Sequence, residues 1–181
     1  MILLMGLPGA GKGTQGKIMA DQHGMHLVSM GEIIRMYVTG ERRIGMLSGE
    51  LLDDQEVILL LDQVLSGISN KDLCVLDGFP RTILQAEWLV NKAEQENFKI
   101  NYVIHLVADE ETVKTRLRAR GRLDDREDVI EERFKEYNQL TLPLVEWFKT
   151  RGIKVVEINA ERSVDEVNDD VTRALHLYHK G

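Results

Sequence analysis

The chain has 181 residues, of which 43% are hydrophobic and 29% are charged, and its 23 basic and 30 acidic side chains leave a formal net charge of −7. This length suits one ordinary domain, and the apolar content excludes an intrinsically disordered chain. The acidic balance argues against a protein whose whole surface binds nucleic acid or an anionic membrane. The single cysteine, Cys74, excludes both a disulfide framework and a four-cysteine zinc site.

The N-terminal apolar run covers only residues 1–5. A membrane-spanning helix needs roughly 20 apolar residues, and a signal peptide needs a basic segment before its apolar one. We therefore expect a cytoplasmic protein without a membrane segment, and a monomer is the simplest expectation for its assembly.

Strand-like and helix-like segments alternate along the chain. The expected strands are residues 1–5, 27–29, 73–77, 102–107 and 154–158. The expected helices are residues 13–23, 31–38, 53 or 54 to 65, 82–96, 109–119, 129–150 with a bend near Pro143, and 164–178. This alternation predicts one α/β domain, an open parallel sheet with helices on both faces, and a ligand beyond the carboxyl ends of the strands.

A glycine-rich segment, Gly6–Thr14, lies between the first expected strand and the first expected helix and reads Gly-Leu-Pro-Gly-Ala-Gly-Lys-Gly-Thr. Its glycines allow successive backbone N–H groups to converge on one anion, and the following helix adds its positive dipole end. Lys12 would place an ammonium group on the phosphates. The general phosphate-loop pattern has Ser or Thr after the lysine, whereas here Gly13 follows it and Thr14 comes one residue later. The alternative is a glycine-rich turn with an incidental lysine.

A second motif, Asp77-Gly-Phe-Pro-Arg81-Thr82, follows the buried strand 73–77. We expect Asp77 to lie beside the glycine-rich loop and to hold Mg²⁺ through the water shell of the ion. Arg81 presents a planar fork that suits phosphate oxygens. The alternative for Asp77 is a helix-capping or turn residue.

Basic side chains are concentrated in residues 114–126, which hold six of them, while the rest of the chain has 17 basic against 28 acidic side chains. Phosphoryl transfer spreads negative charge over phosphate oxygens, which well-placed arginines stabilise. We interpret four arginines as phosphate contacts: Arg116, Arg120, Arg122 and Arg133. Three further cations, Lys114, Arg118 and Arg126, are interpreted as solvent-exposed partners of Asp124, Asp125 and Glu127.

These segments together resemble the adenylate kinase family over essentially the whole chain. The resemblance is carried by Gly6–Thr14, by Ser29-Met30-Gly31-Glu32 with Arg35, by Asp77–Thr82 with Gln85, and by Gly121-Arg122-Leu123-Asp124-Asp125 followed by Arg133 and Tyr137. It implies reversible phosphoryl transfer from magnesium-bound ATP to AMP, giving two ADP. It also implies a P-loop NTPase-type core (1–28, 53–119, 128–181), a small helical AMP-binding flap (29–52) and a short lid (120–127).

The resemblance also implies roles for individual residues. Lys12, Arg81, Arg120, Arg122 and Arg133 would be catalytic, with Gln85 reading the adenine of AMP. The implied ATP site comprises Gly9, Ala10, Gly11, Lys12, Gly13, Thr14, Arg116, Arg120 and Arg162. The implied AMP site comprises Met30, Arg35, Glu50, Leu51, Leu52, Gly78, Phe79, Pro80, Arg81, Gln85, Arg122 and Arg133.

The chain departs from the family pattern at three points. Its lid is very short and cannot be of the zinc type, Met30 stands where the family usually has Thr, and Glu50 stands where Lys is common. Two other functions stay open at this stage. One is a nucleoside monophosphate kinase acting on CMP, UMP or GMP, and the other is a nucleotide-binding ATPase or regulator on the same scaffold. We expect no nucleic-acid or membrane partner and no catalytic role for any of the five histidines.

Overall fold

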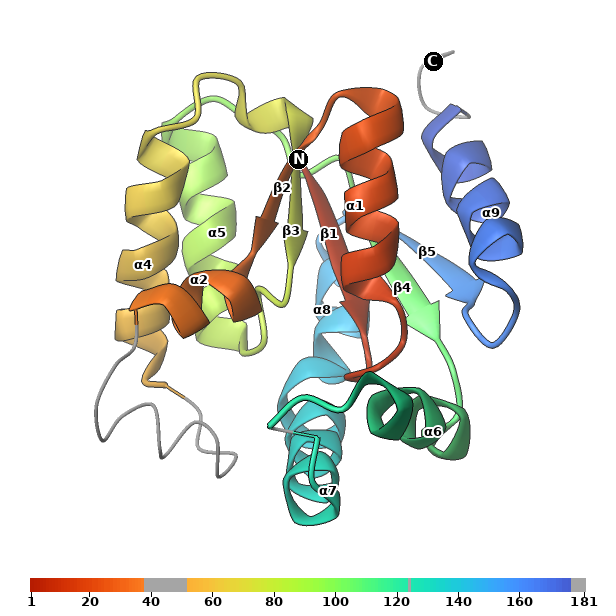
Figure 1. Cartoon of the computed structure of the whole chain (residues 1–181). Coiled ribbons are helices and arrows are strands. Elements are labelled where there is room, and N and C mark those ends of the chain that lie inside the picture. The colour runs from red at the N-terminus through yellow and green to blue at the C-terminus, as the bar shows by residue number, and fades with distance from the viewer. Residues whose placement is uncertain (38–51, 124, 177–181) are drawn as a thin grey trace.

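The computed structural model describes residues 1–37, 52–123 and 125–176. Its centre is a parallel five-stranded sheet in the order β2-β3-β1-β4-β5 (Figure 1). The strands are β1 (Ile2–Gly6), β2 (His26–Ser29), β3 (Cys74–Asp77), β4 (Tyr102–Val107) and β5 (Lys154–Asn159). The predicted sheet is therefore confirmed, with each strand within one or two residues of its expected bounds.

The inner strands are continuous apolar runs because both faces of a parallel sheet are covered. All five residues of β1 are buried, and so are the first five of β4. One face packs against Leu61, Leu89 and Phe148, and the other packs against Met19 and Val171.

Except for those in residues 127–150, the helices begin and end near the expected residues. They are α1 (Lys12–His23), α2 (Met30–Tyr37), α4 (Asp54–Ser66), α5 (Ile83–Gln95), α6 (Glu110–Arg120), α7 (Glu127–Glu136), α8 (Pro143–Thr150) and α9 (Val164–His176), with a 3₁₀ turn at Lys71–Leu73. Side chains of Asp53, Thr82 and Asp109 accept backbone N–H groups at the starts of α4, α5 and α6.

The expected helix over residues 129–150 is wrong as a single element. The chain forms α7, then a π-helical turn, η2 (Tyr137–Thr141), then α8. The Leu142 N–H donates to the Tyr137 carbonyl over 2.8 Å, which closes the wide turn. Pro143 explains the break, since it has no N–H and its ring clashes with the preceding helical turn, so it begins α8 instead.

The carboxyl ends of β1 and β3 lie at the same edge of the sheet, next to the connection between α6 and α7 (Figure 1). The two strand-end motifs thus reach one place. Within the described ranges no helix has both the length and the apolar character needed to cross a bilayer. The division into core, flap and lid stays a prediction, since residues 38–51 and 124 lie outside the described part of the chain.

Candidate active site

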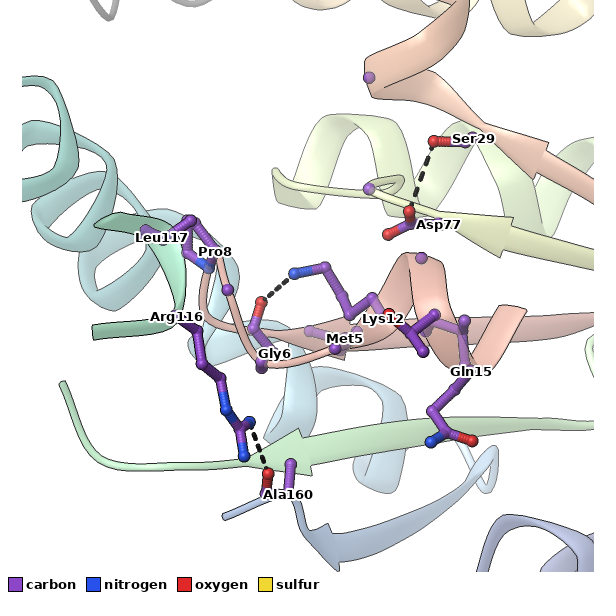
Figure 2. A pocket seen from close by; sticks show the side chains of 18 of the residues that line it. Met5, Gly6, Pro8, Lys12, Gln15, Ser29, Asp77, Arg116, Leu117 and Ala160 are labelled. Atoms are coloured by element: carbon purple, nitrogen blue, oxygen red, sulfur yellow. Dashed lines mark hydrogen bonds between the residues drawn. The ribbon is translucent and has the colours of Figure 1, made fainter. Parts of the chain in front are cut away.

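A cavity of about 690 Å³ opens at the carboxyl ends of the strands (Figure 2). It brings together the glycine-rich loop, the second strand-end motif and the basic cluster, which are far apart in the sequence. The predicted site residues that line it are Gly9, Ala10, Gly11, Lys12, Gly13, Thr14, Arg35, Asp77, Gly78, Pro80, Arg81, Arg116, Arg120, Arg122, Arg133 and Arg162.

Other predicted residues lie elsewhere. Met30, Phe79 and Gln85 are buried and Leu52 is partly buried, and none of the four is among the residues that line the cavity. Glu50 and Leu51 lie outside the described residues.

The glycine-rich loop needs its glycines for two different reasons. Gly9 has a φ of +90°, and a Cβ there would lie 2.9 Å from both Leu117 Cγ and the Val113 carbonyl oxygen, so no side chain fits between the loop and α6. Gly11 has a φ of +97° and stands at the N-cap of α1, where no side chain accepts a hydrogen bond. The first N–H groups of α1 therefore face the cavity as donors for an anion.

Lys12 is held inside its own loop. Its Nζ donates to the carbonyl oxygen of Gly6 at 2.7 Å (Figure 2) and to that of Leu7 at 2.9 Å. Burial lowers the pKa of this ammonium to about 8, with Asp77 acting to raise the value and Arg81 to lower it. A phosphate group in the cavity would supply the negative charge that this buried ammonium lacks.

Asp77 lies across the loop from Lys12 (Figure 2). Its Oδ2 accepts from the Ser29 hydroxyl at 3.4 Å and would be 3.4 Å from a Cβ on Gly13. Gly13 therefore leaves room in front of the carboxylate, in the place where the general loop pattern has a larger hydroxyl residue. The carboxylate is a hard oxygen donor and fits a hydrated Mg²⁺. In the part of the chain that the structure describes, no group of three metal-ligating side chains occurs.

Arg81 is fixed by both its backbone and its side chain. Its N–H donates to Gln85 Oε1 over 2.8 Å, its carbonyl accepts from the Thr141 hydroxyl over 3.0 Å, and its Nε donates to the Gly78 carbonyl over 3.2 Å. Burial lowers the pKa of the guanidinium, which Asp77 and Glu136 partly offset. The result is a pre-oriented cationic fork in the cavity.

Asp125 holds the arginines of the connection between α6 and α7. Its carboxylate accepts from Arg120 Nε and Nη2, at 2.9 and 2.5 Å, and from the Arg122 N–H, at 3.0 Å, while Arg133 Nη1 is 3.9 Å away. Only 2% of the Asp125 side chain is exposed. Burial acts to raise its pKa, but the bonds from Arg120 and Arg122 outweigh burial, and the pKa is lowered.

The sequence interpretation of this acidic residue was therefore wrong, because it paired Asp125 with the solvent-exposed cations. Lys114, whose side chain is only 15% exposed, and the exposed Arg118 pair instead with Glu127, and the exposed Arg126 pairs with Asp128.

Arg116 and Arg162 lie at the β5–α9 side of the cavity. Arg116 donates to the carbonyls of Ala160, at 2.7 Å (Figure 2), and Glu161, at 3.2 Å. Arg162 donates to the Asn159 carbonyl and to Asp170.

Two cavity residues were missed as site residues by the sequence reasoning. Burial raises the pKa of Glu136, which lies near Arg81 and Arg133. The Tyr137 hydroxyl is 2.8 Å from His105 Nε2, beneath the cavity, and burial lowers the pKa of His105 and raises that of Tyr137 to about 12. Their spacing could have indicated this position, since Glu136 and Tyr137 lie about one helical turn after Arg133 and so share its face of the helix.

The comparisons with known proteins agree with this geometry. The family model described as adenylate kinase matches residues 4–153. A protein of Synechococcus sp. (strain CC9902) named adenylate kinase is 35% identical over 180 residues, which cover 96% of this chain and 97% of the relative. A protein of Prochlorococcus marinus (strain MIT 9211) named adenylate kinase is 36% identical over 97% of this chain and 97% of the relative. One of Nitrobacter hamburgensis with the same name is 34% identical over 96% of this chain and 91% of the relative. The chain thus belongs to the adenylate kinase family.

Proposed function

We propose that this protein catalyses reversible transfer of the terminal phosphoryl group of ATP to AMP, giving two ADP. The observation that carries the proposal is that one cavity holds two anion-binding groups. The glycine-rich loop with Lys12 supplies one, and the fixed Arg81 fork with Arg35 supplies the other. A protein that only hydrolyses ATP has no need for the second group.

On the donor side, the loop from Gly9 to Thr14 would bind the ATP phosphates through the N–H groups at the start of α1. Lys12 would leave the Gly6 and Leu7 carbonyls and contact the transferring phosphoryl group. Arg116 and Arg162 would border the base of ATP, next to the carbonyls of residues 160 and 161.

On the acceptor side, Arg35 and Arg81 would hold the phosphate of AMP, with Gln85 at its base. The attacking oxygen of AMP is already anionic, so the reaction needs alignment and charge compensation more than a strong general base. For this reason neither His105 nor Glu136 is required as a base.

Between the two nucleotides, Arg120, Arg122 and Arg133 would stabilise the charge that spreads over the transferring group. The carboxylate of Asp125 would be exchanged for phosphate oxygens as the site fills. The proposal also assigns residues 29–52 to a flap over AMP and residues 120–127 to a lid over the ATP phosphates, which would exclude water from the reaction.

Magnesium is proposed as the cation that accompanies ATP, with Asp77 holding it through water, and the ion would neutralise phosphate charge. We further propose that the enzyme is a monomer and that it acts in the cytoplasm. Sedimentation of the purified protein and assays with magnesium withheld test the first two of these assignments.

The test of the function is an acceptor panel. ADP formation from ATP and magnesium is measured with AMP, CMP, UMP or GMP, and without an acceptor. The proposal expects fast turnover with AMP and a small residual rate without an acceptor. Preference for another nucleotide would reassign the acceptor, and equal rates with and without AMP would indicate an ATPase.

A further inference from the structure

The amide of Gln85 is held at both ends. This residue lies in the first turn of α5 and is 3% exposed. Its Oε1 accepts from the Arg81 N–H over 2.8 Å, and its Nε2 donates to Asp54 Oδ1 over 2.7 Å. A backbone N–H can only donate and a carboxylate can only accept, so both partners require the same orientation of the amide.

The second oxygen of the Asp54 carboxylate is also used. Asp54 Oδ2 accepts from the Thr82 hydroxyl over 2.8 Å, and Thr82 Oγ1 in turn accepts from the Gln85 N–H at 3.3 Å. Asp54 is the first residue of α4, which packs beside α5 (Figure 1). One carboxylate therefore fixes the orientation of the Gln85 side chain and the capping residue of the helix that carries it.

A primary amide has two N–H donors and two acceptor lone pairs, so the bonds to Arg81 and Asp54 leave Gln85 one of each, although Gln85 does not line the cavity in the described structure. A 6-amino purine presents an acceptor, N1, beside an N–H donor. A 6-oxo purine presents the reverse, an N1–H donor beside an oxygen acceptor. An amide that can turn over serves both bases, whereas an amide held in one orientation serves one.

We propose that Asp54 is a positioning residue that makes the acceptor site select 6-amino over 6-oxo purines, by preventing the Gln85 amide from turning over. This inference rests on the proposed function, in which the base of AMP lies against Gln85. In the reversed orientation, Oε1 would face the Asp54 carboxylate and Nε2 would face the Arg81 N–H. Both contacts would then be repulsive, and Arg81 would lose the partner of its backbone N–H.

The test is the near-isosteric change Asp54→Asn. An Asn side chain can offer either its oxygen or its NH₂ group to Gln85, so position 54 no longer favours one orientation. We expect the ratio of kcat/KM for AMP to that for inosine monophosphate to fall by about tenfold. This is about the factor that one hydrogen bond to a charged group contributes. The KM for ATP should stay within twofold of its original value.

The matched control is Asp53→Asn, which removes the same charge one residue earlier. Asp53 accepts from the Gln55 N–H as the N-cap of α4, and in the described structure Gln85 bonds to Asp54 instead. Asn is an equally good N-cap, so this variant should keep the parental acceptor ratio and melting temperature.

An acceptor ratio for Asp54→Asn within twofold of the Asp53→Asn ratio would overturn the inference, whatever the melting temperatures. The same assays on the unchanged protein distinguish this result from failure of the proposed function. If the unchanged protein prefers AMP and the two variants match, only the role of Asp54 fails. If the unchanged protein does not use AMP, the proposed function itself fails.

Discussion

Replacing Lys12 with Met separates the function of this residue from its effect on the fold. Lys12 is partly buried and donates to two carbonyls of its own loop. Met has a similar length and no charge, so Lys12→Met removes the ammonium without opening a large cavity. The expected result is loss of turnover in a protein that is folded and no less stable near neutral pH.

The size of the stability effect follows from the pKa of Lys12, which is lowered from 10.5 to about 8. This difference corresponds to about 3 kcal/mol by which burial disfavours the charged lysine. Below pH 8 Lys12 is charged in both the folded and the unfolded wild-type chain, so the free-energy cost of burying the ammonium is fully present. Between pH 8 and 10.5 the unfolded chain binds more protons than the folded chain, so wild-type stability rises. Lys12→Met lacks this rise, and its stability advantage over wild type should shrink by about 3 kcal/mol between pH 7 and pH 10.5.

Two measurements check this prediction. Urea unfolding of both proteins at pH 7 and pH 10.5 gives the change in their stability difference, in which other titrating groups cancel. A coupled assay of ADP formation gives kcat, which we expect to fall by about 10²–10³-fold, as for loss of one charged group at a reacting centre. Near wild-type turnover would refute the role of Lys12. A stability difference independent of pH would refute the buried ammonium.

Three further substitutions test other parts of the site. Arg81→Ala should raise the KM for AMP at least tenfold while leaving the KM for ATP within twofold, since it removes a cationic side chain from the AMP side of the cavity only. A change confined to the KM for ATP would contradict the assignment of Arg81 to AMP. Arg122→Ala should lower kcat about a hundredfold or more, with smaller changes in either KM, because its charge is needed most in the transition state. An unchanged kcat would show that Arg122 does not contact the transferring phosphoryl group. Gly9→Ala should lower the stability by about 1–3 kcal/mol, because its φ is +90° and its Cβ would lie 2.9 Å from the Val113 carbonyl oxygen; urea unfolding equal to wild type would show that the loop and α6 can move apart.

The sheet and both strand-end motifs could be predicted because their signals are local. Apolar runs of strand length ended at Gly6 and Asp77, and parallel strands place such ends at one edge. The same logic brought Lys12, Asp77 and Arg81 to one cavity. The expected helix starts at residues 53 or 54 and at residue 82 were also local signals, and they lie within one residue of the starts of α4 and α5.

Features that depend on the path of a connection could not be predicted. Asp125 is close in sequence to several cations, and only the turn between α6 and α7 directs its carboxylate to Arg120 rather than to Arg118 or Arg126. The bonds that Gln85 makes to Asp54 and to the Arg81 backbone join separate elements, so no spacing in the sequence predicts them. Pro143 signalled a bend, but not the wide turn that precedes it.

That wide turn has a geometric consequence for the wall of the cavity. Arg133, Tyr137 and Thr141 all line it, each four residues after the last. In a regular α-helix, two successive steps of four residues rotate the side chain by about 80° around the axis, so the third would point roughly at right angles to the first. An i to i+5 turn has more residues per revolution and reduces this rotation. The helix therefore presents a straight column of side chains that runs from the arginine cluster to the backbone of Arg81.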